Sequence, residues 1–531
     1  MEHYGKISCK VGQSELLSRL HFAQLLADRK SQILMRTTSP KLNISHHSLN
    51  EQAELRCRTA LELKDRNEYD AAREALFPIW SGIIGSRPNT KELSVAVAAE
   101  VLLTTGILTG WLGSRSEIKK ADDYARDLIT ESITLYEELH DSRKVAEARS
   151  ELGYCYWRAG AHDEARIYFS EALKRLTIGG NARANALIGL SVVEWSESRF
   201  RESLKILTDN AQLFTRITSH TLRGTYHNQL GITLRAIASA STSRKRASYF
   251  HRAIHEYRVA DEEFKLAKNV VYRAHVKNNI GNVLRDLHHF REAHQSLEQA
   301  RRLFMRVGDK VRMAQVDDTR AQVLIAEGNY GQAELIARTA ARSFERSGRQ
   351  CFFAETLIIQ GIALARLHEP KRARFILQQA IEIAHQAGSS NRAGLAALTM
   401  IEEIETLPRE VQSVAYAQAQ EWLASSDSPD LKPRLKAVAK KIDRGLSRVK
   451  GDVREVLFNK RLDLEEEVLK FERGLISEAL LKVNGKVTHA AKLLGISYQT
   501  LAHMIERKHP DLLKQRTPVR RRPRKRKRKI H

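Results

Sequence analysis

Small residues recur at fixed intervals through the middle of this chain, and this spacing constrains its fold more than any other feature. Four sets share internal intervals of 12, 4 and 3 residues, and the last three sets follow one another every 40 residues. The sets are Gly153, Ala165, Phe169 and Ala172; Gly281, Ala293, Leu297 and Ala300; Ala321, Ala333, Ala337 and Ala340; and Gly361, Ala373, Leu377 and Ala380. Glycines suited to ending helices recur in step at positions 308, 348 and 388. Such a period predicts a repeated structural unit.

These intervals have a mechanical explanation in pairs of helices. A small residue late in one helix lets the next helix cross close to it, and a small residue twelve positions later forms the other side of that contact. The residues four and seven positions further on lie on the same face of the second helix. Each hairpin of helices leaves an apolar stripe that it cannot cover alone, so neighbouring hairpins must stack. The sequence therefore predicts an all-α solenoid of helical hairpins.

The intervals resemble those of the tetratricopeptide repeat. The resemblance covers residues 51–424, where we expect seven to nine hairpins, and it is most specific between residues 145 and 388. Weaker sets begin at Ala60 and Ser191, and an insertion at residues 239–246 lengthens the unit around Gly231. The period exceeds the 34 residues of that family, which longer helices would accommodate. The resemblance implies a concave surface that binds a peptide or protein partner; a spacer or dimerisation scaffold is the alternative.

A second pattern, near the end of the chain, predicts two short helices joined by a tight turn. Its scaffold positions are Gly485, Ala490, Ala491, Leu494, Gly495, Ile496 and Leu501. Gly495 can adopt the left-handed conformation that the turn needs, and Leu501 fills the angle between the helices. Ser497 is placed to cap the second helix. Upstream, an apolar stripe over residues 464–480 predicts one long helix, which ends at Asn484 and Gly485.

This region resembles the Fis-type DNA-binding domain, and the match spans about residues 463–510 of a domain that we place at residues 463–512. The resemblance rests on residues 471–480 together with the spaced pattern from Gly485 to Leu501. It implies a homodimer in which the long first helices form the interface and the recognition helices lie one DNA turn, about 34 Å, apart. Bacterial activators of the nitrogen-regulation type also end in this domain, but they carry an ATPase domain with a glycine-rich phosphate loop. This chain has helical repeats in that place and no such loop motif.

The candidate DNA contacts form two groups. The first lies on the faces of the helix-turn-helix that we expect to be exposed: Thr488, His489, Ser497, Tyr498, Gln499, Thr500, His503 and Lys508. Gln499 can read adenine through two hydrogen bonds, and Tyr498 can meet a phosphate or a thymine methyl group. Thr488 and His489 open the first helix, where they can hold a phosphate. The second group is the basic tail: Arg520, Arg521, Arg522, Arg524, Lys525, Arg526, Lys527, Arg528 and Lys529.

Positive charge brackets the helix-turn-helix. Of a net charge of +25, residues 516–531 carry ten Lys and Arg with no acid, and residues 432–462 carry eleven against three acids. Residues 463–515 carry eight of each sign, and the recognition helix itself departs from the family by having Tyr498, Ala502 and His503 on its reading face. Flexible basic arms follow phosphate backbones or enter minor grooves, so we expect the tail to supply most of the salt-dependent affinity. A solubilising extension is the alternative role for the tail.

Composition sets the remaining boundaries. Residues 425–433 are rich in Ser, Asp and Pro and predict a break, so residues 425–462 form either a basic helical linker or a last helix that caps the solenoid. Residues 1–50 are an N-terminal segment with room for one helix. Residues 513–531 predict a disordered basic tail, because a segment of such charge cannot bury a core.

Several other kinds of site are disfavoured by the sequence. The four cysteines are scattered without paired spacing, which favours a reducing compartment over a disulfide framework or a zinc site. His251 and His255 have a spacing compatible with zinc, but no third ligand accompanies them. We therefore predict no metal site, no cofactor, no catalytic residue and no enzyme activity. Residues 93–113 are long and apolar enough to span a membrane, but Glu100 lies among them, and a core helix is the preferred interpretation.

Together these features predict a bacterial transcriptional regulator in the cytoplasm, associated with the nucleoid and not with a membrane. It would bind double-stranded DNA as a homodimer and receive a protein or peptide partner on its repeats. Two alternatives stay open. In the first, the repeats are a scaffold for protein–protein interaction and the C-terminal helices mainly dimerise the chain. In the second, the basic tail binds RNA.

Overall fold

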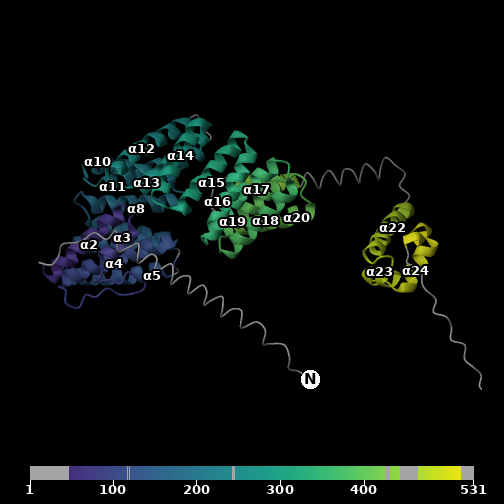
Figure 1. Cartoon of the computed structure of the whole chain (residues 1–531), viewed down its shortest axis with the longest axis horizontal. Helices are drawn as coiled ribbons and strands as arrows, with labels where there is room; N and C mark the ends of the chain where they lie inside the picture. Colours follow the sequence, from purple (N-terminus) through teal and green to yellow (C-terminus); the bar gives the residue numbers. More distant parts are fainter. Residues whose placement is uncertain are drawn as a thin grey trace, which may run out of the picture. The chain divides into compact units, whose positions relative to one another are not determined.

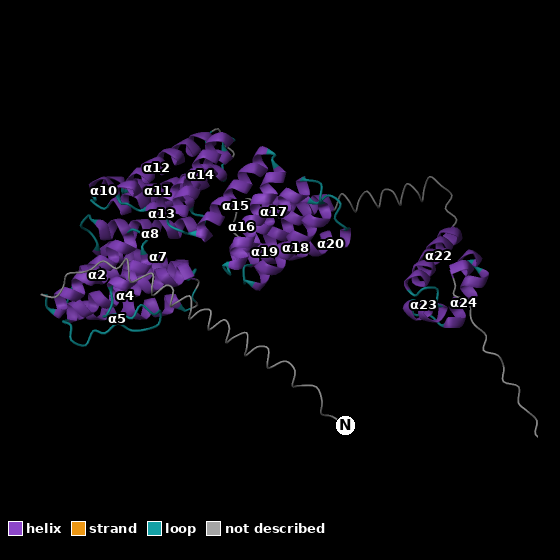
Figure 2. Ribbon diagram, in the orientation of Figure 1, coloured by secondary structure: helices purple, strands orange, loops and turns teal. Residues whose placement is uncertain are grey.

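A computed structural model describes residues 47–116, 118, 120–241, 245–424, 431–442 and 464–515 of the chain. Within these residues every regular element is a helix (Figures 1 and 2). The chain divides into two compact units, residues 1–438 and residues 439–531, which are described separately below. The all-α prediction is confirmed.

The first unit is built from helical hairpins that follow one another along the chain. Its described residues form nine helical hairpins, each made of two consecutive helices that pack together. This number agrees with the seven to nine hairpins expected. The hairpins are α2 (Leu49–Asp65) with α3 (Tyr69–Ala75); α4 (Val95–Ser116) with α5 (Ala121–Glu138); α6 (Ser142–Arg158) with α7 (His162–Arg175); α8 (Asn181–Ser196) with α9 (Phe200–Asp209); α11 (His220–Ser239) with α12 (Arg246–Leu266); α13 (Val270–Asp286) with α14 (Phe290–Arg306); α15 (Lys310–Glu327) with α16 (Tyr330–Arg346); α17 (Gln350–Arg366) with α18 (Pro370–Gln386); and α19 (Ser390–Glu403) with α20 (Arg409–Leu423). A short helix, α10 (Ala211–Arg216), lies between the fourth and fifth hairpins.

The small residues of the repeat are the points where the two helices of a hairpin touch. A Cβ atom added at Gly281 would lie 2.6 Å from Leu297, and one added at Gly361 would lie 2.5 Å from Leu377. Real Cβ atoms do not approach so closely, so these glycines permit the crossing of the helices. The partner in each case lies sixteen positions later, at the third residue of the predicted set. The mechanical explanation of the spacing is confirmed.

Two variations on the repeat also have visible causes. Ser191 and Ser203 occupy the small positions of the degenerate set, and their buried hydroxyl oxygens lie 3.3 Å apart, so a hydrogen bond replaces the apolar contact. At Gly231 the crossing partner is Tyr257, which lies 26 positions later, because the predicted insertion lengthens the connection between α11 and α12. Gly308, Gly348 and Gly388 have φ of 69°, 70° and 72° at the ends of their helices, as the sequence predicts.

The apolar segment at residues 93–113 forms α4. By length and composition α4 could cross a membrane, and it is the one helix with this property in the part of the chain that the structure describes. In its apolar window 78% of the residues are buried inside the unit, and its neighbours are α2, α3, α5 and α6. Glu100 accepts hydrogen bonds from Tyr136 and Lys144, at 2.7 and 2.9 Å, so the charge within this helix is paired inside the protein.

A further helical segment covers residues 431–442, and its residues 431–438 belong to the first unit. Val438 is buried, and the Arg434 guanidinium lies 2.6 Å from the Glu402 carboxylate of α19. Of the two possibilities left open for residues 425–462, these contacts favour a last helix of the solenoid for residues 431–438. Residues 1–46, 425–430 and 443–463 lie outside the described residues, so the predictions made for them are not addressed.

The second unit holds α22 (Leu464–Lys482), α23 (Val487–Leu493), α24 (Tyr498–Arg507) and a 3₁₀ helix, η1 (Pro510–Gln515). Its core combines one face of α22 with the inner sides of the other three helices. The boundary of the predicted tail at residue 513 is wrong. Helix η1 continues to Gln515, which accepts a hydrogen bond of 3.1 Å from the Ser477 hydroxyl, so the folded unit extends three residues beyond the predicted domain end at 512.

Candidate nucleic-acid interface

The turn between α22 and α23 is made by two residues in the left-handed conformation. Asn484 has φ of 52° and Gly485 has φ of 74°, and the Gly485 N–H donates to the Leu480 carbonyl at 2.8 Å. This bond satisfies one of the carbonyl groups that a helix leaves free at its end. Gly485 is buried, so the close approach of the turn to the core also favours a residue without a side chain. The predicted end of the long helix is confirmed.

The turn between α23 and α24 also has a residue in the left-handed conformation and a hydrogen bond back to the preceding helix. Gly495 has φ of 71°, and the Ile496 N–H donates to the Ala491 carbonyl at 3.0 Å. The Ser497 hydroxyl then accepts from the Thr500 N–H at 3.0 Å and caps α24. These contacts place α24 at a fixed angle to α23.

The other scaffold positions form the core beneath the two helices. Ala490, Ala491 and Leu501 are buried, while Leu494 and Ile496 are half-buried around them. Small side chains at 490 and 491 let α23 lie close to its neighbours, and Leu501 fills the space between α23 and α24. The structure therefore gives each predicted scaffold residue a packing or turn role.

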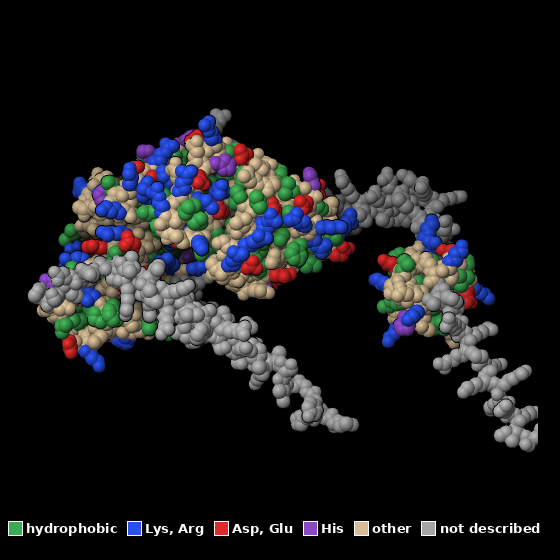
Figure 3. All heavy atoms as spheres, viewed as in Figure 1, with side chains coloured by type: hydrophobic (Ala, Val, Ile, Leu, Met, Phe, Trp, Pro, Cys, Tyr) green, Lys and Arg blue, Asp and Glu red, His purple; other side chains and the backbone are tan. Residues whose placement is uncertain are grey.

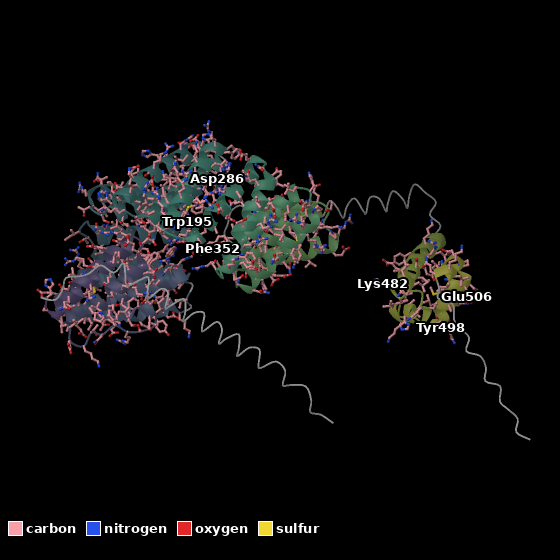
Figure 4. All side chains as sticks on the ribbon, in the orientation of Figure 1. Trp195, Asp286, Phe352, Lys482, Tyr498 and Glu506 are labelled. Atoms are coloured by element: carbon pink, nitrogen blue, oxygen red, sulfur yellow. The ribbon has the colours of Figure 1, made fainter. Side chains whose placement is uncertain are left out.

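The predicted contact residues of the helix-turn-helix lie on its surface. These exposed residues are Thr488, His489, Ser497, Tyr498, Gln499, Thr500, His503 and Lys508. Tyr498, labelled in Figure 4, is 42% exposed at the start of α24. Gln499 follows it, and the exposed His503 lies one turn further along the same helix. This arrangement presents polar and aromatic groups over the first two turns of α24, the part that enters the major groove in helix-turn-helix proteins.

Charge on this surface is balanced. Figure 3 shows basic and acidic side chains side by side on the visible face of the second unit. The Lys508 ammonium lies 3.6 Å from the Glu472 carboxylate of α22, so its charge is partly offset by this pair. Sequence reasoning could not anticipate that pairing, because the two residues are 36 positions apart. The basic residues from Arg520 to Lys529 lie outside the described residues.

Two exposed lysines beside α23 were absent from the predicted contacts. Lys486 precedes the first turn of α23, and Lys492 lies in its last turn. Both are exposed, and they flank the helix that packs against α24. The available signal was their position just outside the apolar scaffold residues, where backbone-contacting lysines are expected in this type of motif.

One face of α22 is apolar and uncovered. Val468, Phe471 and Leu475 are spaced at helical intervals, and they are 55%, 72% and 44% exposed. The opposite face carries Ile476 and Leu480, which are buried in the core of the unit. A monomeric domain rarely leaves a large aromatic residue and two aliphatic neighbours in water on one helix face. This stripe, which we call the α22 face, is therefore a candidate contact surface.

An ion pair connects η1, the last described segment of the unit, to α22. The Arg473 guanidinium lies 2.6 Å from the Asp511 carboxylate, and this hydrogen bond holds the pKa of Asp511 below its usual value. Among the described residues there is no group of three His, Cys, Asp or Glu side chains arranged to hold a metal ion. His251 and His255, considered for zinc, are both exposed on α12.

Comparison with known sequences identifies the motif. Residues 468–505 match the sequence profile of the family described as bacterial regulatory protein, Fis family. The C-terminal unit is thus a Fis-family helix-turn-helix domain, as its residues predict. A comparison with curated proteins finds none that matches this chain.

Comparison with solved structures returns helical-repeat proteins. A Rap protein complexed with competence and sporulation factor is 13% identical, covers 66% of this chain and 98% of its own, with a TM-score of 0.44. A signal transduction ATPase with a tetratricopeptide repeat sensor, from Pyrococcus horikoshii, is 12% identical, covers 72% of this chain and 65% of its own, with a TM-score of 0.45. Aspartyl phosphate phosphatase F from Bacillus subtilis is 11% identical, covers 72% and 96%, with a TM-score of 0.42.

Proposed function

We propose that this chain is a DNA-binding transcriptional regulator that binds duplex DNA through its Fis-family domain. The observation that carries the proposal is the helix-turn-helix geometry: a capped α24, fixed by the Gly495 turn, with Tyr498, Gln499 and His503 exposed. An exposed amide at the start of such a helix can read a base edge. The proposed setting is the bacterial cytoplasm, with the protein on the nucleoid, and no enzyme activity is proposed.

The two sources of affinity are divided along the chain. The exposed residues of α24 supply selectivity, because amide and aromatic groups contact base edges and sugars but neutralise no phosphate. The basic tail, with ten Lys and Arg in residues 516–531, supplies the salt-dependent part. Lys486 and Lys492 add charge beside the motif.

Two copies of the chain bind together in this proposal. The α22 face, formed by Val468, Phe471 and Leu475, is apolar and exposed in the single chain. Pairing with the same face of a second copy would bury it and would give an isologous interface. A dimer would present two recognition helices to half-sites spaced by one DNA turn, so the expected operator is a palindrome.

The helical repeats supply the regulatory input by binding a protein or peptide partner. Stacked hairpins expose a continuous surface of helix faces and turns, which in solenoids serves binding.

Selection of bound sequences from a random duplex pool, using the full chain, tests the proposal. We expect enrichment of a palindrome and tight binding of that site in a gel shift. Gln499→Ala should weaken binding to the selected site by about 5- to 150-fold, the usual value of a paired base contact, and leave binding to unrelated DNA unchanged. Gln515→Ala is the matched control, because this amide lies on η1 and bonds to Ser477. Removing residues 516–531 should weaken both kinds of binding and flatten the dependence on salt.

Two results would overturn the proposal. One is the absence of duplex binding by the full chain at 100 mM salt. The other is binding that survives deletion of residues 460–531. Loss of binding in Gln515→Ala to the same extent as in Gln499→Ala would assign the effect to the fold of the domain instead of to base contact.

A scaffold function is the second candidate, and the weak charge of α24 favours it. The first two turns of α24, from Tyr498 to Thr500 and on to His503, carry no Lys or Arg, and Lys508 is paired with Glu472. In this case the C-terminal domain would only dimerise the chain. Deletion of residues 460–531 would then abolish the dimer, seen by sedimentation, without affecting capture of a partner by the repeats.

A further inference from the structure

The first unit contains a seam where distant hairpins meet. The Asn269 side-chain amide donates to the Asp65 carbonyl at 2.8 Å, although the two residues are 204 positions apart. The Arg349 guanidinium donates to the Arg115 carbonyl across 234 positions. The side chains of Tyr69 and Tyr272 also lie near each other at this seam. The turn of the first hairpin and the end of α4 therefore lie against the beginnings of α13 and α17.

A large cavity lies along this seam. Its volume is about 1160 Å³, and its walls come from the α2–α3 turn, the end of α4, and the beginnings of α13, α15 and α17. In Figure 3 the surface is hollowed at this place, and basic side chains gather beside it. Phe352 of α17, labelled in Figure 4, lies on its wall. The cavity exists because the hairpins curl far enough for the seam to form.

The walls of this seam cavity carry an excess of positive charge. Among the described lining residues six are Arg or Lys and three are acidic; the basic ones are Arg66, Arg115, Lys268, Lys310, Arg312 and Arg349. Burial lowers the pKa of His275 to about 4, so this lining residue is neutral at pH 7 and does not alter the balance. The exposed Arg66, Lys268 and Lys310 come from three separate turns and lie around one space.

Two of the three acids are already engaged by neighbouring cations. The Asp309 carboxylate caps α15 through the Arg312 N–H at 3.0 Å and lies 3.1 Å from the Arg312 guanidinium. Asp70 lies 3.7 Å from Arg115. Helices α13, α15 and α17 also begin at the cavity, and the positive ends of their dipoles add to the potential there. The site is therefore suited to a ligand with more than one negative charge.

Aromatic side chains provide the apolar part of the walls. Trp111, Tyr272 and Phe352 come from three different helices, are half-buried and line the cavity. A ligand that fills this space would combine negative groups with at least one apolar side chain.

We infer that the seam cavity binds an acidic peptide segment, and this inference rests on the proposal that the repeats receive a protein or peptide partner. The volume exceeds the roughly 300–1,000 Å³ of sites for drug-sized ligands. Clusters of arginine and lysine recognise acidic motifs by charge-assisted hydrogen bonds. The exposed Glu68 carboxylate in the same walls would repel a continuous phosphate backbone, whereas a peptide N–H group can bond to it. A peptide therefore fits these walls better than a nucleic acid.

Fluorescence anisotropy with the full chain tests this site. The probe is a fluorescein-labelled peptide of five glutamates, two leucines and one tyrosine, and the comparison peptide has lysine in place of each glutamate. We expect saturable binding of the acidic peptide alone, weakened by salt because the contacts are ionic. The variant Lys268→Glu/Lys310→Glu should weaken it at least tenfold. The matched control is Lys371→Glu/Arg374→Glu, which makes the same change of charge at exposed positions of α18 away from the cavity.

Far-UV circular dichroism and a thermal melt establish that both variants are folded. Equal binding of the two peptides, undiminished binding in the cavity variant, or equal loss in the control would each overturn the inference. A single-stranded oligonucleotide that displaces the acidic peptide, and that no longer binds to the cavity variant, would assign the site to nucleic acid. This result would also overturn the inference. The gel shift with the selected duplex is run on the same variants. DNA binding without peptide binding would refute only the peptide site. Peptide binding without DNA binding would refute only the proposed DNA-binding function.

Discussion

The repeat unit and the Fis-family domain differ in how far their apolar side chains are buried within the unit. In the repeats each hairpin covers its neighbour, so that Phe169 of α7 is fully buried against the glycines of α6 and α8. In the C-terminal domain Phe471 of α22 stands 72% exposed. Both are phenylalanines on amphipathic helices, but among the described residues only the first is covered by its neighbours.

This difference indicates where each region must find its contacts. A solenoid adds hairpins until its stripes are covered, and its free surface can be used for ligands. A domain of about fifty residues has too little chain to cover both faces of its longest helix. The exposed α22 face therefore favours contact with a second molecule, and the following substitutions test the contrast from the largest effect to the smallest.

The largest effect is expected for Phe169→Ala. The substitution leaves a cavity between α6, α7 and α8 and should lower the free energy of unfolding of the repeats by about 3–5 kcal/mol. Urea unfolding followed by circular dichroism measures the change. Phe375→Ala on α18 is the control, since this ring is 69% exposed and its loss should cost at most about 0.5 kcal/mol. A loss below about 1 kcal/mol for Phe169→Ala would contradict the assigned role of this ring.

Phe471→Glu should act on assembly instead of stability. A charge at the centre of the α22 face should raise the dissociation constant of the dimer by at least about thirtyfold, the effect of losing one aromatic anchor. Sedimentation velocity measures it. Leu493→Glu on α23 is the matched control, since Leu493 is also exposed but lies outside the α22 face. A wild-type chain that is monomeric at all accessible concentrations would refute the dimer.

A smaller effect is expected from Asn269→Asp at the seam. Asn269 caps α13 through its side-chain oxygen, which accepts from the Tyr272 N–H at 2.9 Å, and its amide bonds to Asp65. Aspartate keeps the cap but cannot donate to the carbonyl, so the seam should lose about 1–3 kcal/mol. Hydrogen exchange in α2 and α3 would report the loosening. Asn329→Asp is the control because Asn329 caps α16 in the same way without reaching a distant hairpin. Equal effects of the two substitutions would mean that the seam contributes no stability.

The last effects depend on pH. Burial raises the pKa of Asp318 to about 6, above the value near 4 of an unfolded aspartate, so the folded chain binds this proton more tightly. Stability from this group is present below about pH 4 and is lost as pH rises through about 6. The free energy of unfolding of Asp318→Asn, relative to that of the wild type, should therefore rise by about 1–3 kcal/mol as the pH increases from 4 to 7. Urea titrations at a series of pH values measure this change.

Asp511 in the C-terminal domain provides the opposite case. The hydrogen bond from Arg473 lowers the pKa of Asp511, so the stability that it provides is lost as pH falls through the lowered value. Asp511→Asn should therefore reduce stability at neutral pH and make little difference in strong acid. Parallel pH dependence of the two variants would contradict both pKa shifts.

Much of each region was predictable from local pattern. In the repeats the interval between Gly281 and Leu297 sets where two consecutive helices touch, because a hairpin of fixed length has one crossing geometry. In the C-terminal domain Gly495, Ser497 and Leu501 have turn, cap and core roles that depend only on near neighbours. The exposure of Gln499 and His503 follows from the same local geometry.

Other features of the candidate site were not predictable. The pairing of Lys508 with Glu472 depends on how α24 returns to α22, and the inclusion of Leu512 in the core depends on where the chain goes after α24. The domain end predicted from the sequence is residue 512, and the continuation of η1 to Gln515 became visible only in the structure.

The sequence by itself determined the hairpins, the helix-turn-helix and the placement of charge, because each depends on spacings of fewer than about thirty residues. Only the tertiary structure decided that Asp65 meets Asn269 and that Arg115 meets Arg349. Each hairpin turns by a small angle relative to the last, and these rotations accumulate over the intervening hairpins. No local interval encodes their sum, so the seam and the cavity along it become visible only when the whole solenoid is folded.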